Sequence, residues 1–340
     1  MRVLVLGGTQ FVGRAVAEGL IARGWDVSIL TRGRLPVAYG GLARHYRADR
    51  RDPASLRELA GERFDVVVDV SAYTAADVAP VLDTLRLDGA RYVLVSSGAV
   101  YAPSDAARAE DAPTGENEVW GAYGLGKLEA ERLLVAERPQ RGCSLTILRP
   151  AYFYGPGNNL YREAYLFDRL ECGHPVPVPV GGALTQFLHI DDFVRLVVSV
   201  LEAEPWEAEA FNCAHPEPVG WGDLVRAAAA AAGVEPRIVP VDYRGAMEAR
   251  EFFPFRDQTY LLDTGKATRF GLAQPSVALA EGMRSAYACW GGAATRVRPR
   301  CANGVSAHVC ETVRQSAANA LWRAAFLVAG GGTLMPDRSS

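Results

Sequence analysis

Several features that would mark other classes of protein are missing from this sequence. No run of about eighteen apolar residues is present, so no membrane-spanning helix is expected. The six cysteines form no CxxC pair and the five histidines are scattered, which argues against a disulfide framework or a metal site. A formal net charge of −3 gives no general attraction to nucleic acid or anionic lipid. The first residues also lack the basic segment and cleavage site of a signal peptide. We therefore expect a cytoplasmic protein whose partner is a small molecule.

Apolar segments of strand length alternate with helix-like segments through the first half of the chain. The segments are apolar throughout, as expected for strands that are covered on both faces. Phe11–Arg23 repeats its apolar residues with helical spacing and predicts the first crossover helix. The sequence thus predicts an α/β fold, a Rossmann-type doubly wound parallel sheet. The expected strands are Val3–Leu6, Val27–Leu30, Val66–Val70, Tyr92–Val95 and Leu145–Leu148.

The composition changes after Pro150, where loops rich in proline, glycine and tyrosine begin. This change predicts a dinucleotide-binding domain over residues 1–155 and a smaller C-terminal α/β substrate lobe over 156–290. Residues 291–340 form a tail to which we assign no role, with one weakly amphipathic helix expected over Val305–Ala329.

The stretch "GGTQFVG" lies between the first expected strand and the first expected helix. A strand, a glycine turn and a helix N-terminus in this order can hold a dinucleotide pyrophosphate, although an ordinary tight turn is the alternative. Gln10 stands where many such turns carry another glycine, and we interpret it as a tolerated variation near the adenosine end. The residues expected to bind the cofactor here are Gly7, Thr9, Gln10, Phe11, Val12 and Gly13.

The end of the second expected strand reads "SILTRGR" and contains no carboxylate. A carboxylate there would accept from the adenosine ribose, whereas Arg32 or Arg34 can pair with a 2′-phosphate. The sequence therefore favours NADP(H) over NAD(H), the alternative being that both arginines are only solvated surface residues. Asp49, at the end of the strand expected in "YRADRRD", which follows the second strand listed above, is placed to accept from the adenine amino group.

The stretch "YGLGK" places Tyr123 and Lys127 four residues apart on an expected helix, so both project from one face. A nearby ammonium lowers the pKa of a phenol, which makes Tyr123 a candidate general acid or base. Ser97, in "VLVSSGAVY" at a strand end, can hydrogen-bond a carbonyl or alkoxide beside Tyr123. The serine, the tyrosine and the lysine follow the glycine turn in this order, which makes coincidence a poor explanation.

Over residues 1 to about 290 the sequence resembles the extended short-chain dehydrogenases/reductases, the NAD-dependent epimerase/dehydratase family. The resemblance implies that Ser97, Tyr123 and Lys127 are catalytic, that Lys127 also holds the nicotinamide ribose, and that Pro150 borders the cofactor. It also implies that the chain returns to the first domain near 186–214 and 257–263. The stretches that carry it are "GGTQFVG", "SSGAVY", "YGLGK", "LRPAYFYGPGN", "FLHIDD", "FNCAHPEPV", "LLDTGKATRFGL" and "LAEGMRSAYACW".

Two departures from the family pattern narrow the reaction. Dehydratases and decarboxylases of this family carry acidic residues where this chain has Gly98 and Ala99. Without a carboxylate there, we expect ketone reduction, alcohol oxidation or epimerisation through a transient ketone.

His189, in "FLHIDD", is expected to be structural.

Further departures concern the substrate. Members that bind a nucleotide diphosphate often have an arginine where this chain has Thr185 and an asparagine where it has Tyr152. Only Arg256 resembles a second diphosphate-binding arginine, which weakens the case for a sugar nucleotide unless Asn158, Asn159 and Arg162 compensate. The residues expected to touch the substrate are Tyr152, Asn158 and Arg256, and packing between the lobes is the alternative role for the aromatic ring.

The leading hypothesis is an NAD(P)-dependent oxidoreductase that reduces a ketone, or oxidises the alcohol, of a sugar-like or cyclic biosynthetic intermediate. A sugar-nucleotide 4-epimerase with bound NAD+ is the alternative. A non-catalytic dinucleotide-sensing or RNA-associated protein is a more remote one, since such a protein needs no proton donor like Tyr123. The resemblance also points to a homodimer through the helices that flank Tyr123.

Overall fold

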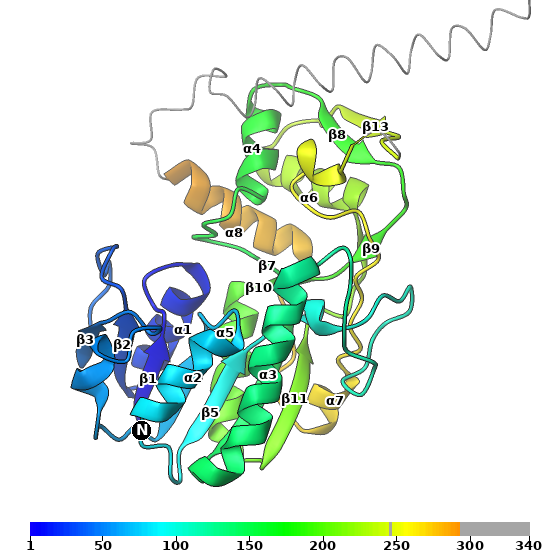
Figure 1. Ribbon diagram of the computed structural model, residues 1–340. Coiled ribbons are helices and arrows are strands. Elements are labelled where there is room, and N and C mark those ends of the chain that lie inside the picture. Colours follow the sequence, from blue (N-terminus) through cyan, green and yellow to red (C-terminus); the bar gives the residue numbers. More distant parts are fainter. Residues whose placement is uncertain (245–246, 293–340) are drawn as a thin grey trace, which may run out of the picture.

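The protein is built on a seven-stranded parallel sheet with the strand order β11-β6-β5-β4-β1-β2-β3 (Figure 1). The computed structural model describes residues 1–244 and 247–292. The predicted α/β fold with a Rossmann-type sheet is confirmed. The strands are β1 (Arg2–Leu6), β2 (Asp26–Thr31), β3 (Arg44–Arg47), β4 (Val66–Asp69), β5 (Arg91–Val95), β6 (Ser144–Pro150) and β11 (Ala208–Cys213).

Helices cover both faces of this sheet, which explains why its strands are apolar throughout. Each face of the sheet carries its own apolar cluster. Along β1, Leu4 belongs to the cluster on one face and Val5 to the cluster on the other face, because successive side chains of a strand point to opposite faces. Val78 of α2 and Leu134 of α3 belong to the first cluster. The helices are α1 (Phe11–Ala22), α2 (Ala75–Thr84), α3 (Gly121–Arg141), α5 (Ile190–Glu202) and α7 (Gly265–Arg269), with short 3-10 helices η1 (Ser55–Leu59) and η2 (Gly98–Val100). A third 3-10 helix, η3 (Ala249–Glu251), packs in the smaller lobe instead.

A smaller lobe with its own apolar core lies beyond the carboxyl ends of the central strands (Figure 1). In it, α6 packs against α4 and α8, and the parallel strands β8 and β13 pair. Two further pairs form outside the main sheet, β7 with β10 and β9 with β12, and Figure 1 shows β7 and β10 between this lobe and the main sheet. The elements are β7 (Tyr152–Tyr154), α4 (Glu163–Glu171), β8 (Val176–Pro179), β9 (Leu184–Thr185), β10 (Phe187–His189), β12 (Val219–Gly220), α6 (Trp221–Ala232), β13 (Ile238–Val241) and α8 (Leu279–Gly292).

The chain passes back from the smaller lobe to the main sheet. After β10 and α5, β11 pairs with β6 at the edge of the sheet. His189 is 2% exposed and its ring nitrogens contact the Ser285 hydroxyl and the Asp191 amide, so the structure gives it a packing role. Among the helices of the described ranges, none is both long and apolar enough to cross a membrane. The helix expected over Val305–Ala329 lies outside the described residues.

Candidate active site

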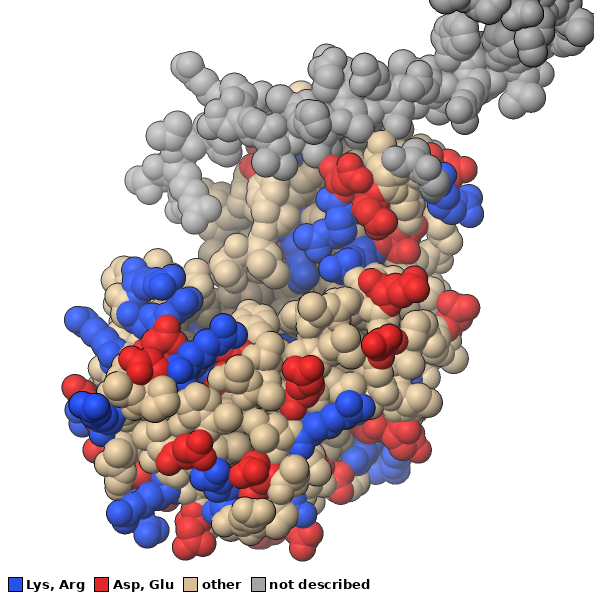
Figure 2. Space-filling view, in the orientation of Figure 1, with Lys and Arg blue, Asp and Glu red and all other residues tan. Residues whose placement is uncertain are grey.

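A cleft of about 510 Å³ lies where the carboxyl ends of β1, β4, β5 and β6 face the smaller lobe. Figure 2 shows the hollow between the two parts of the molecule. We call it the main cleft. A second cavity of about 450 Å³, the side cavity, continues from it past the ends of β2 and β3. Both are lined by Gly7, Thr9, Gln10, Ser71 and Tyr73, so the two form one path long enough for a two-part ligand.

The glycine turn after β1 has the backbone that the sequence predicts for a phosphate-binding turn. Gly7 and Gly8 have φ angles of 112° and 118°, which favour glycine. A Cβ on Gly13 would lie 2.6 Å from the Gly8 nitrogen, so only glycine lets α1 pack this closely on the turn. The N-cap Gln10 makes no side-chain cap, and the first turn of α1 has no acidic residue. The amide groups of this helix N-terminus therefore remain available to an anion, and the six residues predicted here all line the main cleft.

The side cavity contains the residues predicted to recognise the adenosine end. Arg32, Arg34 and Asp49 all line it, and so does Arg51. Within the described part of the chain, neither Arg32 nor Arg34 forms an ion pair with a carboxylate. The Asp49 carboxylate accepts from the Arg51 amide at 3.0 Å. Two guanidinium groups are thus free to meet an anionic group in this cavity.

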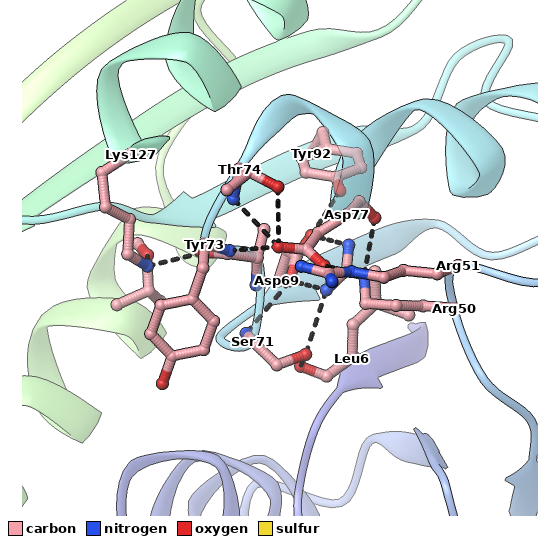
Figure 3. Close-up of polar contacts among 12 residues, drawn as sticks. Leu6, Arg50, Arg51, Asp69, Ser71, Tyr73, Thr74, Asp77, Tyr92 and Lys127 are labelled. Atoms are coloured by element: carbon pink, nitrogen blue, oxygen red, sulfur yellow. Dashed lines mark hydrogen bonds and ion pairs between the residues drawn. The ribbon is translucent and has the colours of Figure 1, made fainter. Parts of the chain in front are cut away.

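A buried ion-pair network lies beneath the side cavity (Figure 3). The Arg50 guanidinium donates to both carboxylate oxygens of Asp69, at 2.7 and 2.5 Å, and Tyr92 donates to the same carboxylate at 2.7 Å. Burial disfavours the charge on Asp69, but Arg50 outweighs this and lowers the pKa of Asp69. Beside this pair, Arg51 donates to Asp77 at 2.5 Å. The network fixes the floor of the cavity, and no motif in the sequence predicted it.

The same network holds the loop that follows β4. Asp69 accepts from the amides of Ser71 and Ala72 at 3.1 and 3.0 Å. The Ala72 carbonyl in turn accepts from the Lys127 ammonium at 2.6 Å. Tyr73, in the same loop, is 56% exposed and lines both cavities. The adenosine end and the lysine side of the site are therefore joined through this loop.

The three predicted catalytic residues all line the main cleft. Ser97 follows β5 and caps η2, its hydroxyl accepting from the Ala99 amide at 3.1 Å. Tyr123 lies in the first turn of α3, with its ring centre 6.2 Å from that of Tyr73. Burial of its hydroxyl raises the pKa of Tyr123, and a hydrogen bond with Ser97 opposes this rise.

Lys127 is 4% exposed and its ammonium donates to two main-chain carbonyls, Ala72 at 2.6 Å and Val95 at 2.9 Å. It also lies 4.9 Å from the centre of the Tyr73 ring. Burial lowers the pKa of Lys127 to about 8. Because an ammonium has three N–H donors, one remains for a ligand after the two carbonyls. That Lys127 acts on the phenol of Tyr123 remains a prediction.

Three arginines line the side of the main cleft that belongs to the smaller lobe, the lobe that the sequence predicts to bind the substrate. These substrate-side arginines are Arg162, Arg250 and Arg256. Arg162 lies over the Tyr152 ring at 4.9 Å, and Arg256 lies over the Trp120 ring at 5.4 Å. None of the three has an ion-pair partner among residues 1–244 and 247–292, and the cleft lining contains no carboxylate there either. Their charges therefore face the cleft uncompensated.

The predicted substrate-binding residues separate in the structure. Tyr152 and Arg256 line the main cleft, and Pro150 lines it beside them. The side chain of Asn158 instead donates to Glu163 at 2.7 Å and accepts from the Leu160 amide at 3.0 Å, while its neighbour Asn159 lines the cleft.

Sequence reasoning did not find Tyr73, Arg250 or Tyr260, which all line the main cleft. Tyr73 follows the carboxyl end of β4, where ligands of parallel sheets bind, so this position was a usable signal. Arg250 lies in the three-residue 3-10 helix η3 and Tyr260 in an irregular segment, and no spacing pattern marks either of them.

Comparison with known proteins agrees with this geometry. The family model of the NAD dependent epimerase/dehydratase family matches residues 3–214. The chloroplast stem-loop binding protein of 41 kDa b of Arabidopsis thaliana is 33% identical over 84% of this chain and 78% of its own. A 3-diazoavenalumate denitrifying reductase of Streptomyces is 33% identical over 63% of this chain and 75% of its own. Other relatives are named as sugar reductases or nucleotide-sugar epimerases.

The fold has solved counterparts. The UDP-glucose 4-epimerase of Thermotoga maritima, crystallised with UDP-glucose, superposes with a TM-score of 0.72 at 20% identity. The match covers 86% of this chain and all of that one. The chain therefore belongs to the NAD dependent epimerase/dehydratase family, the NAD(P)-dependent reductases and epimerases of the extended short-chain dehydrogenase/reductase type.

Proposed function

We propose that the protein is an NADP(H)-dependent reductase that acts on the ketone of a sugar-like substrate carrying an anionic group. One observation carries the proposal: the glycine turn, the hydroxyls of Ser97 and Tyr123, and the substrate-side arginines all border a single cleft. The glycine turn binds phosphate, the two hydroxyls exchange a proton with a bound oxygen, and the arginines hold a negative charge.

The cavity fits a nicotinamide dinucleotide. The pyrophosphate would meet the amides at the start of α1, with Thr9 and Gln10 beside them, and the adenine would meet Asp49. Lys127 and Pro150 would border the nicotinamide half, where Lys127 has a donor left for the ribose. The nicotinamide, when bound, supplies or accepts the hydride.

The remaining chemistry belongs to the side chains of the chain itself. Tyr123 gives a proton to the substrate oxygen in reduction and takes it back in oxidation, while Ser97 orients that oxygen by hydrogen bonding. The positive charge of Lys127 favours the phenolate form of Tyr123. Since no carboxylate lines the described part of the main cleft, no acidic side chain is available there for dehydration.

The preference for NADP(H) over NAD(H) follows from the charges of the side cavity. Arg32 and Arg34 line it without ion-pair partners in the described ranges, so a 2′-phosphate would compensate their charge. With a 2′-hydroxyl in its place, both guanidinium groups would be hydrated and would have no anionic partner. Two structural neighbours that contain NAD share the fold only, at 21% identity, and leave this choice open.

Two other functions have an observation in their favour. A sugar-nucleotide 4-epimerase with bound NAD+ needs the same Ser97, Tyr123 and Lys127, and a substrate diphosphate would suit the substrate-side arginines. RNA stem-loop binding is favoured by the name of the Arabidopsis relative. Nothing in stem-loop binding calls for a proton donor in the cleft, so the reductase explains more of the site.

A titration distinguishes these functions. NADPH and NADH are titrated against the wild type, Arg32→Ala and the control Arg57→Ala, whose exposed side chain lies outside both cavities. We expect NADPH to bind more tightly than NADH, and Arg32→Ala to lose about tenfold of the NADPH affinity only. A panel of keto-sugars, each free, phosphorylated and nucleotide-linked, then tests NADPH oxidation.

Each result has a defined meaning. Oxidation of NADPH by a phosphorylated or nucleotide-linked member supports the proposal. Copurified NAD+ with turnover that needs no added cofactor overturns it in favour of the epimerase. Binding of a stem-loop RNA without dinucleotide binding or turnover overturns it in favour of RNA binding.

A further inference from the structure

Tyr39 joins the loop between β2 and β3 to the glycine turn. Its hydroxyl donates to the Gly8 carbonyl at 2.7 Å. A Cβ on Gly8 would lie 3.4 Å from the same hydroxyl oxygen and 2.7 Å from the Ile29 side chain, so these two side chains cover Gly8 closely. Tyr39 itself lines neither the main cleft nor the side cavity. The contact therefore reaches the turn from outside the two cavities.

This hydrogen bond fixes one peptide group of the turn. Gly8 has a φ of 118°, and a glycine rotates more freely than other residues, so the orientation of the peptide that follows it needs an anchor. In a trans peptide the carbonyl and the amide hydrogen point in nearly opposite directions. With the Gly8 carbonyl held by Tyr39, the amide hydrogen of Thr9 is directed away from Tyr39. Since Thr9 lines both cavities, a bound pyrophosphate can meet this amide.

The loop that Tyr39 fastens also carries the two arginines of the side cavity. We call residues 32–38 the arginine loop. Its first five residues are exposed, and Arg32 and Arg34 among them line the side cavity. Past this loop the chain packs on α1, where a Cβ on Gly41 would lie 2.6 Å from a side chain of the helix. Tyr39 therefore connects the segment that carries both guanidinium groups to the turn that faces the pyrophosphate.

The phenol of Tyr39 is suited to a lasting hydrogen bond. The residue is half-buried, and the guanidinium of Arg14, on α1, lies 5.9 Å from the centre of its ring. Burial raises the pKa of Tyr39 to about 12, so the hydroxyl keeps its proton well above neutral pH. A neutral phenol has one proton to donate, and the Gly8 carbonyl accepts it.

We propose that Tyr39 is a positioning residue for the cofactor, which holds the Thr9 amide toward the pyrophosphate and ties the arginine loop to the same turn. The inference rests on the proposed function for the identity of the bound phosphate groups. It adds that one hydroxyl couples the two elements that meet the pyrophosphate and the 2′-phosphate. A Tyr39 with a packing role alone would hold the loop through its ring and would not need the hydroxyl.

Titration of the two dinucleotides against Tyr39→Phe tests the proposal. The variant keeps the ring and removes the hydroxyl. The affinities for NADPH and NADH should each fall roughly threefold to tenfold, because both ligands contain the pyrophosphate. The control Tyr165→Phe removes a phenol that donates to the Phe252 carbonyl at 2.7 Å outside both cavities, and it should leave the two affinities unchanged. Affinities of Tyr39→Phe within about twofold of the wild type would overturn the proposal.

A double variant tests the link between the turn and the arginine loop. Arg32→Ala alone should lower the NADPH affinity only. In the Tyr39→Phe background the same substitution should cost less NADPH affinity than it does in the wild type, since the loop is no longer tied to the turn. Two independent losses, each of full size in the double variant, would overturn the coupling.

The Thr9 amide supplies a readout that a packing role would not move. In protein labelled with 15N-threonine, its resonance is assigned by its loss in Thr9→Ser. Saturating NADPH should shift this resonance in the wild type and shift it less in Tyr39→Phe, because the peptide no longer has one fixed direction. Equal shifts in the two proteins would count against the proposed orientation and overturn it.

Turnover separates this inference from the proposed function. Weakened binding of both dinucleotides by Tyr39→Phe, in a protein that oxidises NADPH with no member of the keto-sugar panel, would support the Tyr39 inference while refuting the reductase. Turnover of a keto-sugar, with dinucleotide affinities that Tyr39→Phe leaves unchanged, would support the reductase and overturn the inference.

Discussion

Two groups of arginines differ in what faces them. In the sheet half, Arg50 is paired with Asp69 and Arg149 with Glu131, all four side chains being at most 10% exposed. Of the substrate-side arginines, Arg162 and Arg256 have aromatic rings beside them, and none of the three has a carboxylate partner in the described chain. Paired charges hold strands and loops in place, whereas unpaired cations in a cleft can bind an anionic ligand.

The difference has an energetic basis. Removing one member of a buried pair leaves the other charge without compensation, which destabilises the fold. Removing a cation that has no ion-pair partner leaves no buried charge uncompensated. It also relieves repulsion between neighbouring cations: burial lowers the pKa of Arg162, and the positive charge of Arg250 lowers it further. The first group should therefore matter to stability and the second to binding.

The largest expected effect is on the paired group. Arg149→Met leaves Glu131 buried without its cation and should lower the free energy of unfolding by about 3–5 kcal/mol. The control Arg226→Met breaks an exposed pair with Asp223 and should cost less than about 1 kcal/mol. Chemical denaturation measures both, and equal losses in the two variants would contradict the distinction.

The next effect is on the unpaired group. Arg162→Ala should raise KM for an anionic substrate by about tenfold to a hundredfold, because a charged hydrogen bond is lost. Its free energy of unfolding should stay within about 0.5 kcal/mol of the wild type. Arg237→Ala, exposed and outside the main cleft, is the matched control and should change neither value. A KM that Arg162→Ala leaves unchanged would assign these arginines to packing.

The smallest effect concerns Lys127, a cation paired only with main-chain carbonyls. Because burial lowers the pKa of Lys127 to about 8, its ammonium is present below that pH and is lost as the pH rises through it. NADPH affinity should therefore fall by about fivefold between pH 7 and pH 9. Lys127→Met should bind more weakly at pH 7 and lose this pH dependence. A wild-type affinity that is flat over the range would count against a role for the ammonium in cofactor binding.

The parts that the sequence predicted are those encoded locally. Strands such as Val3–Leu6 are apolar because both faces are covered, and the glycine turn and Tyr123 with Lys127 each lie within a few residues. One strand was predicted a residue too long, ending at Val70 where β4 ends at Asp69, since the loop after it is also buried in part.

The parts that were not predicted depend on distant segments. The partner of Arg50, which lies in the turn after β3, is Asp69 at the end of β4, and Tyr260 reaches the main cleft only through the packing of the smaller lobe. Asn158 and Asn159 are neighbours in an irregular loop, where no periodicity says which one faces the cleft. Tertiary packing decides such contacts, and a single sequence carries no local mark of them.

The most direct test of the account is single-turnover hydride transfer with deuterium-labelled NADPH, comparing the wild type with Tyr123→Phe. The account predicts that deuterium appears on the carbinol carbon of a keto-sugar from the panel. It also predicts that Tyr123→Phe lowers the rate about a hundredfold to ten-thousandfold, with NADPH affinity within about twofold of the wild type. Wild-type rates in Tyr123→Phe, or no deuterium transfer to any member, would contradict it.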